Sequence, residues 1–189
     1  MDPTPLTDST KSRLLVASPM LGDPNFERTV VFILEHSDEG AVGLVLNRPS
    51  EVEIEEPLED WSRFTSYPSV VFVGGPVSRE AVIALARAAQ GRIDDSWQPI
   101  LGPVGVLDLT SDADLIGAAI DDLRIFSGYA GWGPGQLEGE IDEGAWFVVE
   151  AEAADAFAAT PADLWRDVLR RQPLPLKRYA LFPPDLRWN

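Results

Sequence analysis

Residues 29–47 read TVVFILEHSDEGAVGLVLN, and this stretch decides what kind of fold the chain adopts. Thr29–Glu35 and Ala41–Asn47 are short runs rich in Val, Ile and Leu, joined by a hairpin-length loop that ends in Gly40. Two such runs at this spacing are typical of a β-hairpin. Because both runs are almost continuously apolar, we expect both of their faces to be covered, as in the middle of a sheet.

Similar apolar runs predict five further strands: Arg13–Ser18, Ser69–Val73, Val104–Leu109, Arg124–Ala130 and Ala145–Glu150. Helix-start signals predict three helices. The first would be capped by Ser78, the second would be capped by Ser111, and the third would begin at Thr160-Pro161. The first of these would end at Gly91. Strands and helices in this mixed order indicate an α+β (α/β) fold rather than a regular βαβ array.

Length and composition indicate one globular domain. The chain has 189 residues, and we expect a disordered tail at 1–11 followed by a single domain at 12–189. There is no cysteine, which fits a reducing compartment and excludes disulfides and thiolate chemistry. The acidic, polar start resembles neither a secretory signal nor a transit peptide, so a cytoplasmic location is expected.

The net charge of −16 restricts the partners that the chain can take. Nucleic acids and anionic lipids are bound mainly through Lys and Arg, so direct nucleic-acid binding is disfavoured and no membrane is expected. Residues 51–60, EVEIEEPLED, hold six acids and no base. Such a block is usually a solvated loop or a frayed helix, but a DNA-mimicking or partner-docking surface is an alternative. The partner is therefore expected to be an unidentified protein or small molecule.

No recognisable catalytic or metal-binding motif is present. His36 is the only histidine and would have to be the base of any Ser-His-Asp hydrolase, yet no G-x-S-x-G motif presents a serine. An exposed or capping role is the ordinary outcome for a histidine just before a hairpin loop. The many carboxylates match no calcium-loop pattern, so no metal and no cofactor are expected. Enzymatic activity stays uncertain, with the balance against it.

Two glycine-rich segments are the better candidates for a binding site. Gly128–Gln136 reads GYAGWGPGQ, which is dense enough in glycine to predict turns, and its Tyr129 and Trp132 could line a contact surface or plug the core. Gly74-Gly75-Pro76 lies between a predicted strand and a predicted helix. Backbone N–H groups at such a place can hold an anion, although a plain turn is the alternative.

These residues resemble the AlgH/YqgE family of bacterial proteins. The resemblance is carried by Leu14–Met20, Gly40–Gly43, Asn47-Arg48-Pro49, Val73–Val77 and FSGYAGWGPGQLEGE at 126–140, and runs from about 12 to 171. It implies a mixed, mostly antiparallel sheet curled into a pseudo-barrel with flanking helices. The chain departs from the family pattern at Ser78–Ala81, where a Phe-Val-Leu-His segment is usual, and in its last 18 residues.

The resemblance implies no known reaction. The family carries the label of a transcriptional regulator, which comes from genetics rather than from a demonstrated DNA-binding surface. The first hypothesis is therefore a non-catalytic regulatory or adaptor protein. The second is a small-molecule-binding protein or hydrolase with an anion seat at Gly74-Gly75 and His36 as base, and the third is direct DNA binding. The predicted binding residues are Asn47, Arg48, Gly74, Gly75, Pro76, Gly128, Tyr129, Gly131, Trp132 and Gln136.

Overall fold

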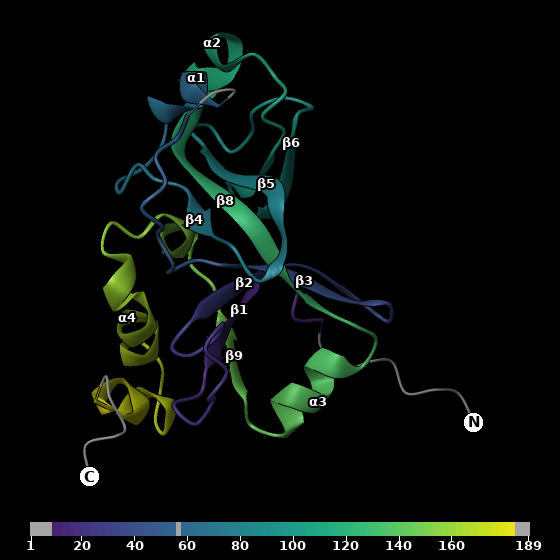
Figure 1. The fold of residues 1–189 in the computed structure, drawn as a ribbon, viewed down its shortest axis with the longest axis vertical. Coiled ribbons are helices and arrows are strands. Elements are labelled where there is room, and N and C mark those ends of the chain that lie inside the picture. The colour runs from purple at the N-terminus through teal and green to yellow at the C-terminus, as the bar shows by residue number, and fades with distance from the viewer. Residues whose placement is uncertain (1–8, 56–57, 184–189) are drawn as a thin grey trace.

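A computed structural model describes residues 9–55 and 58–183 of the chain, in which a curled, mostly antiparallel sheet is flanked by short helices (Figure 1). Within these residues the sheet has nine strands. They are β1 (Arg13–Ala17), β2 (Val30–Ser37), β3 (Gly40–Val45), β4 (Phe72–Val73), β5 (Val77–Ala88), β6 (Trp97–Leu101), β7 (Val104–Leu107), β8 (Ile120–Trp132) and β9 (Trp146–Glu150). The mixed α/β fold with a curled sheet, expected from the sequence and the family resemblance, is confirmed.

The order across the sheet is β6-β7-β5-β8-β3-β2-β1-β9, and β4 pairs with β8 in parallel. The predicted hairpin is confirmed, since β2 and β3 pair antiparallel with Phe32 opposite Leu44. Its strands lie inside the sheet, between β1 and β8. Both faces of β2 are buried from Val30 to Leu34, which explains why this run is apolar without alternation.

Strand β8 holds the two halves of the sheet together. Its first part pairs with β5 and β4, and its last residues pair with β3, where Ala41 lies opposite Trp132. The change of partner falls between Tyr129 and Ala130, just after Gly128, whose φ of +70° is in the left-handed region that favours glycine. Figure 1 shows β8 crossing from the half of the molecule that carries α1 and α2 to the half that carries α3.

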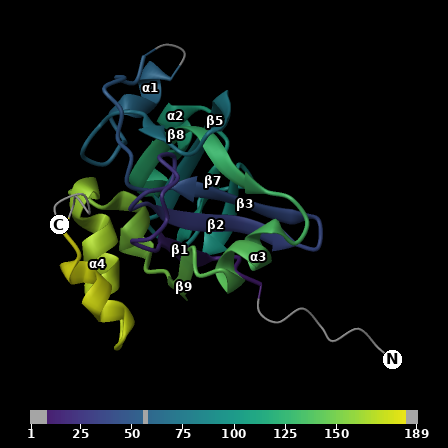
Figure 2. The ribbon, with the colours of Figure 1, turned by 60° about the horizontal axis from the view of Figure 1, so that its bottom comes forward.

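The α-helices among the described residues are short: α1 (Glu59–Ser62), α2 (Ala113–Ile116), α3 (Gln136–Asp142) and α4 (Leu164–Arg170). Four 3₁₀ segments accompany them, at Gly117–Ala119, Ala153–Phe157, Pro161–Asp163 and Leu176–Leu181. The helix predicted after Thr160 is confirmed, and α4 packs its buried Trp165 against β1, where the indole Nε1 donates to the Ala17 carbonyl at 2.8 Å. Figure 2 shows α4 beside the sheet and α3 near the β2–β3 hairpin.

Two helix predictions need correction. The segment from Ser78 to Gly91 is not a helix, because Val77–Ala88 forms β5. Its run of Val, Ile, Leu and Ala has helix-compatible spacing, but the segment gains more by pairing with β7 and β8 on its two sides. The second predicted helix is only the short α2, and its cap is Asp112 rather than Ser111, since the Asp112 side chain accepts from the Asp114 N–H.

The expected disordered tail is described only in part. Residues 1–8 lie outside the described residues, whereas Thr10 is buried and its backbone N–H donates to Nδ1 of His36 at 3.1 Å. The ordered contacts of the chain thus begin before β1.

A buried arginine supports the half of the sheet around β5. Arg124, on β8, is 1% exposed and donates to the carbonyls of Ala156, Ala158 and Tyr67 at 3.2, 3.2 and 2.9 Å. Its guanidinium lies 4.2 Å from the centre of the Phe72 ring. Burial lowers the pKa of Arg124 to about 10, since the charged form loses its hydration. The side chain therefore ties two loops to the sheet through backbone carbonyls.

Because the backbone at Gly74 packs directly on the backbone of β8, adding one methyl group at this position should destabilise the fold. A Cβ atom at Gly74 would lie 2.3 Å from the Gly128 carbonyl oxygen, which cannot move without displacing β8. We expect Gly74→Ala to lower the free energy of unfolding by at least about 2 kcal/mol, measured by urea denaturation. Gly139→Ala is the matched control, because a Cβ atom added at Gly139 in α3 would meet nothing within 4 Å, and it should leave stability unchanged or raise it. Equal effects of the two changes would contradict this account.

Candidate functional site

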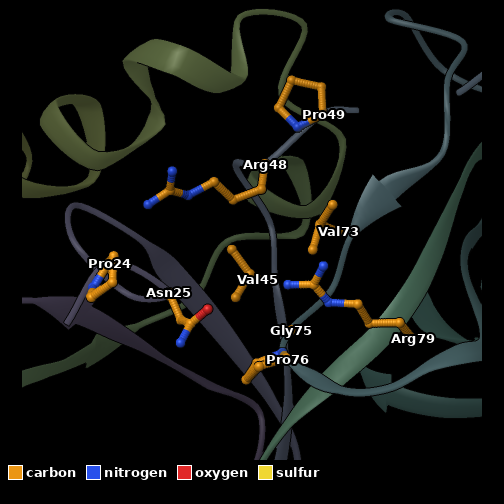
Figure 3. A pocket seen from close by; sticks show the side chains of 9 residues that line it. All are labelled: Pro24, Asn25, Val45, Arg48, Pro49, Val73, Gly75, Pro76 and Arg79. Atoms are coloured by element: carbon orange, nitrogen blue, oxygen red, sulfur yellow. The ribbon is translucent and has the colours of Figure 1, made fainter. Parts of the chain in front are cut away.

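A pocket of about 230 Å³ opens between the end of β3, the segment after it, and the β4–β5 connection (Figure 3). We call it the arginine pocket, because its lining contains two arginines and no acid. The lining residues are Pro24, Asn25, Val45, Arg48, Pro49, Val73, Gly75, Pro76 and Arg79. Three of the predicted binding residues, Arg48, Gly75 and Pro76, are among them.

Glycine allows the walls of the arginine pocket to come together. Gly74 donates its backbone N–H to Ser127 of β8 at 2.9 Å, and its carbonyl accepts from Val45 of β3 at 2.8 Å. A Cβ atom at Gly75 would lie 2.1 Å from the Tyr129 carbonyl carbon. The two glycine-rich segments singled out in the sequence therefore touch each other, and their glycines serve close backbone packing. The expected helix start is absent, so any anion there would be held by other groups.

The two arginines enter the pocket from different segments. Arg48 follows β3, and its Nη2 donates to the Glu27 carbonyl at 2.6 Å. Arg79 lies near the start of β5, and within residues 9–55 and 58–183 its guanidinium contacts no hydrogen-bond acceptor or carboxylate. Figure 3 shows the Arg79 guanidinium extending towards Val45 and Val73. A guanidinium without a protein partner beside a pocket can pair with an anion from solution.

A second hollow of about 270 Å³ adjoins the pocket and shares Arg48 with it. Its other lining residues are Glu27, Arg28, Asn47 and Ala162. The guanidinium of Arg28 lies 4.6 Å from the centre of the Trp165 ring and donates to the Pro183 carbonyl. Burial, and then the charge of Arg166, lower the pKa of Arg28, while the charge of Glu27 raises it. Arg28, Arg48 and Arg79 thus line two neighbouring hollows of a strongly acidic protein.

Asn47 supports the backbone around the pocket, because both polar groups of its side-chain amide bond to the protein backbone. Its side-chain oxygen accepts from the Val30 N–H at 3.0 Å, and its amide nitrogen donates to the Arg28 carbonyl at 2.9 Å. Both ends of the amide are therefore used to hold β2 to the segment that carries Arg48. The Arg48 carbonyl in turn accepts from the Val73 N–H at 2.8 Å, which fixes the backbone of Arg48 against β4.

His36 lies outside both hollows. Its Nδ1 accepts from the Thr10 backbone N–H, and its Nε2 lies 2.8 Å from a carboxylate oxygen of Glu138 in α3. Because Nδ1 accepts from an N–H, the proton of the neutral ring is on Nε2 and is donated to Glu138. The histidine thus links the first described residues to α3, with both ring nitrogens engaged. Neither His36 nor Glu138 lines the arginine pocket or the hollow beside it.

The aromatic side chains of the glycine-rich segment are buried or partly buried. Gly128–Trp132 belongs to β8 and Gln136 begins α3, so the predicted turn is confined to the residues between them, where Gly135 has a φ of +72°. Trp132 is 6% exposed, so its ring is buried and does not form a contact surface. Tyr129 is partly buried against the core. Gln136 is exposed, but its side chain accepts from the Gly133 N–H and donates to Glu140.

Trp132 is buried because a carboxylate satisfies its indole. One oxygen of Glu140 accepts from the indole N–H of Trp132 at 2.9 Å and from that of Trp146 at 2.8 Å. The rings of the two tryptophans and Phe26 pack together, with centroids 5.5 to 6.2 Å apart. Glycine at 131 and 133 gives Trp132 neighbours without side chains. The alternative that the aromatic residues plug the core is therefore correct for Trp132.

Sequence reasoning missed Arg79, the most available cation of the pocket. The sequence pattern placed it in the first turn of a helix, and only the strand β5 brings it beside Arg48 and Gly75. One signal was available, because Arg79 lies in the segment where the chain departs from the family pattern. Across the described part of the chain, no cluster of three or more His, Asp or Glu side chains is placed to hold a metal ion. No helix of that part is long and apolar enough to cross a membrane.

Comparisons with known proteins agree with the fold and the motifs. A family model described as AlgH-like matches residues 14–177. A UPF0301 protein of Streptomyces coelicolor is 49% identical over 185 residues, which are 96% of each chain. A UPF0301 protein of Mycobacterium tuberculosis is 43% identical over 180 residues, covering 93% of this chain and 89% of that protein.

Two solved structures are also similar. The crystal structure of a Corynebacterium diphtheriae protein has a TM-score of 0.87 and 33% identity, covering 93% of this chain and 94% of the other. The solution structure of the AlgH protein from Pseudomonas aeruginosa has a TM-score of 0.67 and 30% identity, covering 98% of this chain and all of that one.

The carboxylate between the two tryptophans gives a test of the buried cluster. We expect Glu140→Ala to lower the free energy of unfolding by about 2–5 kcal/mol, because two buried indole N–H groups would lose their acceptor. Glu140→Gln keeps one side-chain acceptor and should cost less. Urea denaturation followed by tryptophan fluorescence measures both, with Glu143→Ala, at an exposed position, as control. A Glu140→Ala variant as stable as the Glu143→Ala variant would show that the indoles do not need this carboxylate.

Proposed function

The chain belongs to the AlgH-like family, and we propose that it is a non-catalytic regulatory protein that binds a small anionic ligand in the arginine pocket. The observation that carries this proposal is the pair Arg48 and Arg79 beside Gly75, in a lining without a carboxylate. This combines the regulatory role of the first hypothesis with the anion seat of the second.

Electrostatics support an anion as the ligand. With 31 acids against 15 bases, a surface chosen at random on this chain would carry negative charge. The pocket and the adjoining hollow instead gather Arg28, Arg48 and Arg79, with Glu27 as the acid in their combined lining. Arg79 has no described partner to lose on binding, so its charge is available to phosphate or carboxylate oxygens. The surrounding acids would repel larger polyanions, which favours a small ligand.

The size and the apolar residues of the pocket limit the ligand further. A volume of about 230 Å³ is slightly below the usual range of small-molecule sites, so the ligand has few heavy atoms or extends past Arg48 into the second hollow. Pro24, Val45, Pro49, Val73 and Pro76 give apolar walls around the arginines. Such a site fits a compact organic phosphate or carboxylate better than a bare ion.

Binding is favoured over hydrolysis by the residues that line the pocket. They include no Ser, Thr, Cys, His, Asp, Glu or Lys side chain, and hence no nucleophile or general base. The only histidine of the chain is held between Thr10 and Glu138. The hydrolase alternative, with His36 as base, therefore receives no support from this geometry. Direct DNA binding stays the third hypothesis.

Titration calorimetry with inorganic phosphate and a panel of small phosphorylated and carboxylated metabolites tests the proposal. We expect at least one compound to bind, and Arg79→Ala to weaken that binding by about tenfold to a hundredfold, because a hydrogen bond to a charged group contributes about 1.5–3 kcal/mol. Arg48→Ala should weaken it as well. A bound ligand should also raise the melting temperature of the wild type more than that of either variant.

Arg92→Ala is the control, because Arg92 is an exposed arginine that pairs with Asp95 away from this pocket. It removes the same charge and should leave affinity unchanged. An equal loss in the Arg92→Ala and Arg79→Ala variants would mean that net charge alone governs binding. Retention of duplex DNA without binding of any small anion would favour the third hypothesis and overturn the proposal.

A further inference from the structure

An apolar hollow of about 520 Å³ lies over β5 and β7, towards the end of the molecule that carries α1 and α2. Its lining is apolar apart from Asp108 and Thr110, and consists otherwise of Leu58, Val82, Ile83, Val106, Leu107 and Leu109. None of these residues lines the arginine pocket. The hollow is therefore a separate surface, which the proposed ligand site does not use.

Residues of the hydrophobic core form part of the wall of the hollow. Leu107 belongs to the core cluster around Trp61 and Ala84, and Leu58 and Leu109 pack against that cluster. Val82 remains 50% exposed at the edge of the hollow, where the register between β5 and β8 shifts between Val77 and Val82. A half-exposed valine beside an open apolar lining is a place where a side chain of another molecule can be buried.

Two acidic segments contribute to the lining of this hollow, the first through Leu58 and the second through Asp108, Leu109 and Thr110. Residues 51–63 contain six acids with Arg63 as the sole base, and residues 108–122 contain five aspartates and no base. The segments are held together, since the indole of Trp61 donates to the Leu109 carbonyl at 3.1 Å and Arg63 pairs with Asp114. Ile54, between Glu53 and Glu55, is buried in the same cluster that underlies the hollow.

Most of these acids are available to a partner. Within the described residues, Arg63 pairs with Asp114 and Arg87 with Asp122, whereas no ion pair forms with Glu53, Glu55, Glu59, Asp60, Asp108, Asp112 or Asp121. Asp108 lines the hollow itself, and hydrogen bonds from the backbone and hydroxyl of Thr110 lower the pKa of its carboxyl. A negative charge therefore stays at the edge of the apolar surface at neutral pH.

We infer that this acid-rimmed hollow docks a basic, amphipathic segment of a partner protein. Its apolar side chains would enter between Leu58, Val82 and Leu109, while Lys or Arg residues on its other positions would face the surrounding acids. The arrangement combines a small apolar seat with charge complementarity around it. The alternative of a frayed, merely solvated block does not account for the apolar hollow that Leu58 of this block helps to line.

Fluorescence polarisation with two labelled peptides of equal charge tests the inference. One peptide contains Lys with Leu at helical spacing, and in the other every Leu is replaced by Ser. We expect the wild-type protein to bind the Leu-containing peptide at physiological salt at least about tenfold more tightly than the Ser-containing one, because a buried apolar side chain adds that much affinity. Equal binding of both peptides, removed by salt, would reduce the surface to a nonspecific polyanion and overturn the inference.

Variants of the protein locate the binding site. Val82→Lys places a charge in the hollow and should weaken binding of the Leu-containing peptide about tenfold or more, whereas Leu174→Lys, at a position 64% exposed outside the hollow, should not. Asp108→Asn retains the acceptor for Thr110 and provides a second variant if Val82→Lys is poorly folded. Equal losses in Val82→Lys and Leu174→Lys would contradict the assigned site.

Two further measurements separate this surface from other possibilities. Light scattering of the wild type and of Val82→Lys would show whether a second copy of the chain binds in the hollow. A wild-type dimer that becomes monomeric in Val82→Lys would overturn the inference. Anion binding at the arginine pocket should be the same in Val82→Lys and the wild type. Failure of either proposal can therefore be distinguished from failure of the other.

Discussion

The backbone of β8 is the constraint on which the rest of the structure depends. This strand pairs with β5 and β4 up to Tyr129 and with β3 from Ala130 to Trp132, so both halves of the curled sheet are built on it. Gly128 takes the left-handed conformation that redirects the strand, and Gly74 and Gly75 let a second segment pack directly on it. Because no side chain separates these backbones, Arg48 and Arg79 are brought to one pocket from segments on either side of β4.

Positive charge in this acidic molecule is divided between structural and available groups. Arg124 is buried and donates hydrogen bonds to loop carbonyls. Arg171 donates two hydrogen bonds of 2.6 Å to the carboxylate of the buried Asp155. These contacts raise the pKa of Arg171, chiefly through the hydrogen bond to Asp155. Arg79 differs from both, since its guanidinium has no described partner and faces a pocket. That difference supports a binding role for Arg79 and a structural role for the others.

The arginine pocket and the acid-rimmed hollow suit a regulator that links a small ligand to a protein partner. β5 contributes to both, through Arg79 near its start and through Val82 and Ile83 further along. Its register against β8 shifts between Val77 and Val82, a stretch that contains Arg79, so the first residues of β5 pair less regularly than the rest. The same strand thus borders a pocket lined by two arginines and a hollow lined by Asp108, and under the two proposals opposite charges would select different partners at each.

The sequence by itself determined the β2–β3 hairpin, the helix after Thr160, the mixed α/β class and the family, because local apolar runs, turn glycines and caps specify these features. It also singled out Arg48, Gly75 and Pro76, which line the arginine pocket. Only the tertiary structure decided that Val77–Ala88 is a strand, that Trp132 is buried and that Arg79 joins Arg48. The physical reason is that each depends on distant partners: β7 and β8 flank β5, and Glu140 accepts from Trp132 across the turn before α3. Such pairings have no signal in the local residue pattern, where the run in β5 suits a helix equally well.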